Sequence, residues 1–133
     1  MKTIKFRAWD KQINKWYKPT NEAYKGNLFE VLIGFSGDLV AHTMTGLVHE
    51  SMWPDRFELM QFTGLKDKNG VEIYEFDIVA IDNEENPVIT KCIYEPGYFT
   101  LLDSAGGSWT RQLFHQQERL EVVGNRFENP ELL

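Results

Sequence analysis

The chain has very little cysteine and no long hydrophobic run. Cys92 is the only cysteine among 133 residues, so neither an intrachain disulfide nor a zinc site made of cysteines can form. The longest apolar run, residues 29–35, is interrupted by Glu30 and Gly34 and is too short to span a bilayer. The start of the chain alternates charged and apolar residues and lacks the apolar stretch of a signal peptide. We therefore expect a cytoplasmic protein with no membrane segment.

Positive charge is also scarce outside the first 25 residues. The chain has 14 basic and 20 acidic residues, for a net charge of -6, which argues against a protein that coats duplex DNA. Residues 1–25 carry +5 and the remainder −11, and residues 69–90 contain six acids without Lys or Arg. This asymmetry fits a dipolar domain, head-to-tail contacts between subunits, or a basic face for an anionic partner.

What the sequence has is alternation of apolar and polar residues over short segments. Turn residues separate these segments about every 8–12 residues, and no long helical period appears. The expected strands cover residues 4–9, 15–18, 28–35, 39–44, 57–65, 71–81, 88–95, 98–103 and 120–123. A short helix is an alternative for 28–35, residues 19–27 are expected to be a loop, and 45–55 are ambiguous. Residues 115–119 form one helical turn at most.

The predicted fold class is mainly β, with an SH3-like small barrel in the C-terminal part. We divide the chain into a β-rich, or α+β, N-terminal lobe (1–56), the barrel (57–124) and a docking C-terminal tail (125–133). Within the barrel, Asp67 and Gly70 predict a hairpin tip. The glycine supplies a positive φ, and the aspartate bonds to the local backbone.

Three stretches resemble a known family. They are IKFRAWD (4–10), QFTGLKDKNGVEIYEFDIV (61–79) and VVGNRFENPELL (122–133). In these stretches the chain is similar to the YopX family, which is encoded largely by phages and prophages of low-GC Gram-positive bacteria. The resemblance implies a β-rich fold with an SH3-like barrel, self-association and no assigned catalytic residues. The family usually has glycine where Phe76 stands, which leaves open whether this chain makes the same tight turn before Asp77.

Motifs for catalysis and for metal binding are weak. Gly64 to Gly70 has the wrong spacing for a phosphate loop, and the acidic turn 82–86 is expected to be solvated. The three histidines, at 42, 49 and 115, form no pair with metal-ligand spacing. Cys92 is expected to be a buried hydrophobe. The sequence therefore predicts no cofactor, no metal and no enzymatic activity.

Aromatic residues are the most unusual feature of the composition, at 14% of the chain. SH3-like barrels often bind ligands through exposed aromatics, although core aromatics are commoner. The candidate partner-binding residues are Trp9, Tyr74, Tyr98 and Trp109.

The C-terminal tail is the candidate docking segment. A free tail should be polar, yet Phe127, Leu132 and Leu133 are apolar. They are expected to dock either on the same barrel or on a second subunit.

Three functions follow from these features. The first is a non-enzymatic phage accessory protein that self-associates as a homo-oligomer and binds a host or phage protein. The second is an SH3-like nucleic-acid-binding module that uses the basic residues 2–25. The third, a small hydrolase, is weakened by the missing catalytic groups.

Overall fold

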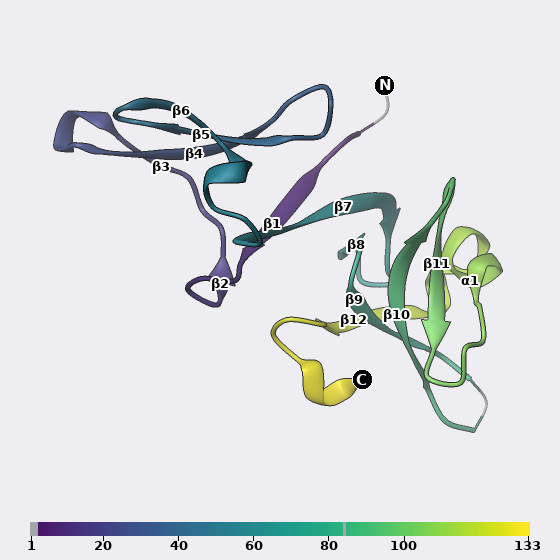
Figure 1. Cartoon of the computed structure of the whole chain (residues 1–133). Coiled ribbons are helices and arrows are strands. Elements are labelled where there is room, and N and C mark those ends of the chain that lie inside the picture. Colours follow the sequence, from purple (N-terminus) through teal and green to yellow (C-terminus); the bar gives the residue numbers. More distant parts are fainter. Residues whose placement is uncertain (1–2, 84) are drawn as a thin grey trace. The chain divides into compact units, whose positions relative to one another are not determined.

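The computed structural model describes residues 3–83 and 85–133 and is mainly β, as predicted. Lys2 of the basic segment and Glu84 of the acidic turn lie outside the described residues. The strands are β1 (Phe6–Asp10), β2 (Lys15–Trp16), β3 (Thr20–Glu22), β4 (Asn27–Ile33), β5 (Leu39–Thr43), β6 (Gly46–His49), β7 (Phe57–Lys66), β8 (Glu72–Tyr74), β9 (Asp77–Ile81), β10 (Val88–Glu95), β11 (Tyr98–Asp103) and β12 (Leu120–Asn125) (Figure 1). The helical elements are α1 (Thr110–His115) and the 3-10 turns η1 (Ala23–Lys25), η2 (Glu50–Met52), η3 (Gln117–Arg119) and η4 (Pro130–Leu132).

The chain divides into two compact units. Unit 1 contains the residues up to Arg7 together with Leu59–Leu133, and unit 2 contains Ala8–Glu58. The sequence-based boundary at residue 57 lies close to this division, but residues 3–7 belong with the C-terminal part. Strands β1 and β7 each contain residues of both units and belong to a sheet of order β2-β1-β7-β8.

Unit 1 contains an antiparallel sheet of order β11-β10-β9-β12. Its apolar positions face one core cluster because alternate residues of a strand point to the same side. The cluster also takes in Leu113 of α1, which follows β11 along the chain. Its buried members are Ile73, Val79, Ile81, Cys92, Leu101, Leu113 and Leu120. The mainly β class is confirmed here, while the SH3-like detail stays a prediction.

The hairpin tip between β7 and β8 forms as the sequence predicts. Gly70 has φ of 79°, and the Asp67 Oδ1 accepts the N–H groups of Asn69 (2.8 Å) and Val71 (2.9 Å). The other carboxylate oxygen of Asp67 accepts the Val122 N–H at 2.9 Å. One aspartate therefore closes the hairpin and attaches strand β12 to it.

Unit 2 contains an antiparallel sheet of order β3-β4-β5-β6. The register pairs Leu32 with Val40, Val40 with His49, and His42 with Leu47. These residues share one side of the sheet, which we call the outer face: Glu30, Leu32, Val40, His42, Leu47 and His49. Leu39 and Ala41, on the opposite side, are buried.

Several local expectations are corrected by the structure. Residues 19–27, expected to be a loop, contain strand β3, which pairs Thr20 with Phe29. The strand expected at 28–35 is confirmed as β4, which ends at Ile33, and its helical alternative is wrong. The ambiguous segment 45–55 contains β6 and η2. The segment 71–81, expected to form one returning strand or more, contains β8 and β9 with a turn at Glu75 and Phe76 between them. Among the described helices, none has the length and apolar character needed to cross a membrane.

Candidate functional site

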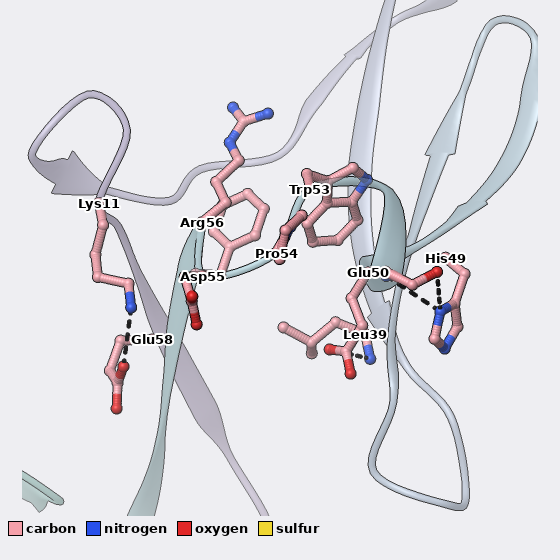
Figure 2. Close-up of a pocket in the computed structure, with 11 residues that line it drawn as sticks. Lys11, Leu39, His49, Glu50, Trp53, Pro54, Asp55, Arg56 and Glu58 are labelled. Carbon is pink, nitrogen blue, oxygen red and sulfur yellow. Dashed lines mark hydrogen bonds and ion pairs between the residues drawn. The ribbon is translucent and has the colours of Figure 1, made fainter.

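Unit 2 contains a hollow of about 370 Å³. It follows the loop after η2, and Figure 2 shows Trp53, Pro54 and Arg56 along this loop. At one side the ammonium group of Lys11 lies 3.5 Å from the Glu58 carboxylate. The hollow thus combines apolar surface with charges of both signs, a mixture that suits a peptide more than a small apolar ligand.

Arg56 is held in place by a buried carboxylate. Its Nη2 donates to Asp10 Oδ2 at 3.1 Å, and its Nε lies 3.3 Å from Oδ1. The guanidinium also lies 4.9 Å from the ring centroid of Phe57 and 5.1 Å from that of Phe29. Because Asp10 is buried, losing Arg56 would leave an uncompensated charge in the interior. The pair therefore stabilises unit 2, and its cation is already neutralised.

Asp38, His49 and Glu50 bring three potential ligand atoms within 4.8 Å of one another. His49 ends β6 and Asp38 directly precedes β5, so the pairing of these two strands brings them together. The Glu50 Oε2 accepts the Leu39 N–H at 3.1 Å. Sequence analysis did not identify Asp38, His49 and Glu50 as a candidate ligand set, because their spacing matches no ligand motif.

Cys92 and Asp77 are two of the buried polar or ionisable groups of unit 1. Burial raises the pKa of the Cys92 thiol far above its ordinary value, and the neighbouring Asp77 raises it further. Burial also raises the pKa of Asp77, although Arg7 and the Tyr74 N–H oppose this shift. A thiol that resists ionisation is a poor nucleophile, so Cys92 acts as core packing.

The aromatic residues predicted to bind a partner belong to both units and differ in their surroundings. Trp9 is in unit 2, where it is buried with its ring centroid 5.1 Å from that of Trp16. In unit 1, Tyr74 lies against Phe62, and the Arg7 guanidinium is 4.4 Å from the Tyr74 centroid.

Trp109 and Tyr98 of unit 1 have different environments. Trp109 packs against the core and donates its indole N–H to Asp103 at 2.9 Å. Tyr98 is 47% exposed. Of the four predicted aromatics, Tyr98 is therefore the most available to a ligand.

The C-terminal tail lies on unit 1. The ring of Phe127 packs edge-on against Phe76, with centroids 6.1 Å apart. Leu132 and Leu133 line a hollow of about 280 Å³ together with Ile89 and Leu102. They remain 42% and 55% exposed, so intrachain docking covers them only in part.

Phe76 keeps a turn between β8 and β9. Its φ is 66°, in the left-handed region that favours glycine. Its N–H donates to the Cys92 carbonyl at 2.7 Å, and its carbonyl accepts the Arg126 N–H at 2.9 Å. The Arg126 guanidinium lies 4.1 Å from the Phe76 centroid. These contacts hold a bulky residue in a conformation that it rarely adopts, and the sequence alone left this turn open.

Comparisons with known proteins give a consistent result. A family profile described as YopX protein matches residues 5–133. The crystal structure of protein EF1440 from Enterococcus faecalis is similar, with a TM-score of 0.62 and 27% identity over 100% of this chain and 99% of that chain. Protein yopX from Bacillus subtilis has the same TM-score and coverage at 24% identity, which bears on the fold alone. No curated protein matches the chain.

Proposed function

Because the chain belongs to the YopX family, we propose on that premise that it is a non-enzymatic accessory protein that associates with itself and binds a protein partner. In this proposal it acts in a bacterial host that carries a phage or prophage. The binding surface is the outer face of the β3-β4-β5-β6 sheet in unit 2.

The outer face supports this proposal through its exposed apolar side chains. Leu32 is 49% exposed and Leu47 is 70% exposed. Val40 is directly opposite Leu32 and diagonal to Leu47, so the three residues form a continuous patch on neighbouring strands. A contiguous apolar patch on a soluble protein is typical of an interaction site.

The polar residues of the outer face favour a protein partner over a lipid surface. Glu30 and His42 lie across the strand pair with 3.7 Å between the imidazole Nδ1 and the carboxylate. An apolar centre with polar residues beside it is the usual composition of a protein interface. A second copy of the chain presents the same patch and can bury it around a two-fold axis.

Nucleic-acid binding is the alternative, and the basic N-terminal segment would carry it. In unit 1, Lys5 pairs with Glu72 and Arg7 with Asp77. In unit 2, Lys11 pairs with Glu58 and Lys25 with Glu22. These ion pairs reduce the positive charge offered to phosphates, which favours the protein-binding proposal. A gel shift at low and high salt tests the alternative.

Light scattering of the full-length protein across a concentration series tests the proposal. We expect association beyond the 15.5 kDa monomer. Leu47→Ser should raise the concentration at half-association at least tenfold, equivalent to about 1.4 kcal/mol, because it places a hydroxyl in the patch. Val123→Ser is the matched control, since Val123 is 39% exposed on β12 of unit 1. Deletion of residues 130–133 measures the contribution of the tail in the same assay.

A protein that stays monomeric at high micromolar concentration would refute the self-association. An equal effect of Leu47→Ser and Val123→Ser would show that the outer face is not the interface. Retained partner capture by a monomeric Leu47→Ser variant would separate partner binding from self-association.

A further inference from the structure

We propose that Asp38, His49 and Glu50 form a binding site for a first-row divalent cation, of which Zn²⁺ fits best. Each residue offers one ligand atom, and the three atoms lie within 4.8 Å of one another. Asp38 precedes β5, His49 ends β6 and Glu50 begins η2 of the same chain, so the site needs no ligand from a second subunit, although His49 also belongs to the outer face.

The separation of His49 and Asp38 suits a shared cation better than a hydrogen bond. His49 Nε2 is 3.5 Å from Asp38 Oδ2, beyond the usual range for an N–H···O bond. Zinc binds imidazole nitrogen and carboxylate oxygen at about 2.0–2.2 Å. At a tetrahedral angle, two such ligands lie about 3.4 Å apart. Side chains at this spacing need little movement to bind the ion.

Neighbouring groups already orient two of the ligands. The Leu39 N–H donates to Glu50 Oε2 at 3.1 Å and fixes the direction of that carboxylate. The Ser51 hydroxyl oxygen lies 3.0 Å from His49 Nδ1 and can accept a hydrogen bond from an Nδ1–H group. With the proton on Nδ1, the lone pair of Nε2 faces Asp38 and is available to a metal. This tautomer gives up the longer contact in which the Ser51 N–H donates to Nδ1 at 3.2 Å.

The donor set selects the class of cation. One imidazole nitrogen and two carboxylate oxygens are typical zinc ligands, and a fourth position stays open to water. Calcium requires six to eight oxygen ligands, and magnesium requires a near-ideal octahedron. Two carboxylates also balance the charge of a divalent ion. Asp38 and His49 are about half exposed, so we expect moderate rather than very tight affinity.

Calorimetric titration of the full-length protein with zinc chloride at neutral pH tests the site. We expect one ion per chain. His49→Asn and Asp38→Asn should each weaken binding at least tenfold. His115→Asn is the control, since His115 is an exposed imidazole in α1 of unit 1 and lies outside the outer face, and it should change the affinity less than twofold. Imidazole ¹⁵N spectra should show that the His49 signals shift first.

Three results would overturn the proposal. They are the absence of saturable binding up to millimolar zinc, unchanged binding by His49→Asn, and an equal loss in His115→Asn. Because the Asp38 side chain is 54% exposed, Asp38→Asn should fold normally and shows whether a loss in His49→Asn reflects the ligand or the fold. Circular dichroism of each variant confirms that its fold is intact.

Discussion

Phe76 shows how one residue can keep a turn that its side chain disfavours. A left-handed backbone costs an L-residue roughly 1–2 kcal/mol, and Phe76 has φ of 66°. Its ring compensates by contacting Arg126 and Phe127. The residue therefore links the turn before β9 to the segment after β12. The sequence predicted the β-rich segment around Phe76 but could not show whether side-chain contacts would offset the backbone strain.

Replacement of Phe76 by glycine and by alanine separates the two effects. Both variants lose the ring contacts, but only Phe76→Gly relieves the left-handed strain. We expect Phe76→Gly to be more stable than Phe76→Ala by about 1 kcal/mol, the reverse of the usual order in regular structure. Urea denaturation measures the difference. If Phe76→Ala were the more stable variant, the turn would not impose a positive φ on this position.

The hydrogen bonds around Asp103 should make the stability of the protein depend on pH. The Trp109 indole N–H holds the pKa of the Asp103 carboxyl below its ordinary value of 3.8, with help from the Gly107 N–H. A lowered folded pKa contributes stability above about pH 4, and this contribution is lost as the pH falls through the folded pKa. We expect Asp103→Asn to be less stable than the native protein at pH 7.

The stability gap between the native protein and Asp103→Asn should narrow as the pH falls from 5 to 2. Urea denaturation at several pH values measures this gap. Glu85→Gln, in the exposed turn before β10, is the control and should run parallel to the native curve. A gap that stays constant through this range would mean that the Trp109 contact does not depend on the charge of Asp103.

At the scale of elements, strand β12 and the tail that follows it are joined by a network of hydrogen bonds. The Asn125 Oδ1 accepts the N–H groups of Phe127 (2.8 Å) and Glu128 (3.0 Å). The Asn129 N–H returns to the Asn125 carbonyl at 2.9 Å. Gly124 permits this return, because a Cβ there would lie 2.4 Å from Asn129 Oδ1 and 2.7 Å from its Cγ. The stretch VVGNRFENPELL (122–133) therefore forms a turn that holds the tail on unit 1.

Gly124→Ala should displace the tail without unfolding the core. Overpacking of this kind typically costs about 1–3 kcal/mol. We expect faster hydrogen exchange at the N–H groups of Phe127 and Glu128, with unchanged exchange in β9. In an Asn129→Ala background, which lacks the clashing Oδ1 and Cγ atoms, the same substitution should have a smaller effect. An equal effect in both backgrounds would place its cause elsewhere.

The strands that the sequence predicted correctly have an apolar face that becomes buried. The segments 57–65, 88–95 and 98–103 alternate apolar and polar residues, and they became β7, β10 and β11. Strand β3 consists of Thr20, Asn21 and Glu22, which lack such a face, so its existence depends on backbone pairing with Asn27–Phe29. Local alternation carries no information about that pairing.

The candidate cation site was hidden for a related reason. Asp38 and His49 are brought together by the pairing of β5 with β6, in which Val40 lies opposite His49. The sequence predicted β5, but the segment that contains β6 was ambiguous. Asp10 and Arg56 are separated by 46 positions, and no pattern in the sequence indicates that they meet. Contacts that depend on strand register or on distant segments cannot be derived from the periodicity of one chain.

At the scale of the whole molecule, the charge asymmetry of the sequence does not follow the two units. Unit 2 contains five basic and seven acidic residues, and unit 1 contains nine basic and thirteen acidic residues. The basic segment 1–25 is shared between them, so the units carry net charges of −2 and −4. The two units therefore offer weaker electrostatic support for head-to-tail contacts between subunits than the +5 and −11 segments of the sequence suggested. The apolar outer face carries the association proposal instead.

The division into units predicts that unit 1 folds without unit 2. Its buried cluster comes from its own residues, and its first strand is held by the Phe62 N–H, which donates to the Lys5 carbonyl at 2.9 Å. If Lys5 and Phe62 lie opposite one another in an antiparallel pair, then Arg7, two residues after Lys5, lies opposite Met60, two residues before Phe62. The two-residue turn Asn-Gly can connect such a pair. A chain in which Asn-Gly replaces residues 8–59 should therefore retain the Arg7–Asp77 ion pair and the core.

We expect this shortened protein to unfold cooperatively and to give a dispersed amide spectrum. The reason is that a unit whose residues form their own hydrophobic core can fold alone. Thermal denaturation followed by circular dichroism and nuclear magnetic resonance measures both properties. Asp77→Ala in the shortened chain is the control, and it should cost about 3 kcal/mol, since it leaves the Arg7 guanidinium without its buried partner. A broad transition with collapsed amide dispersion would show that unit 1 needs Ala8–Glu58 to reach its native packing, and the two units would then be one cooperative domain.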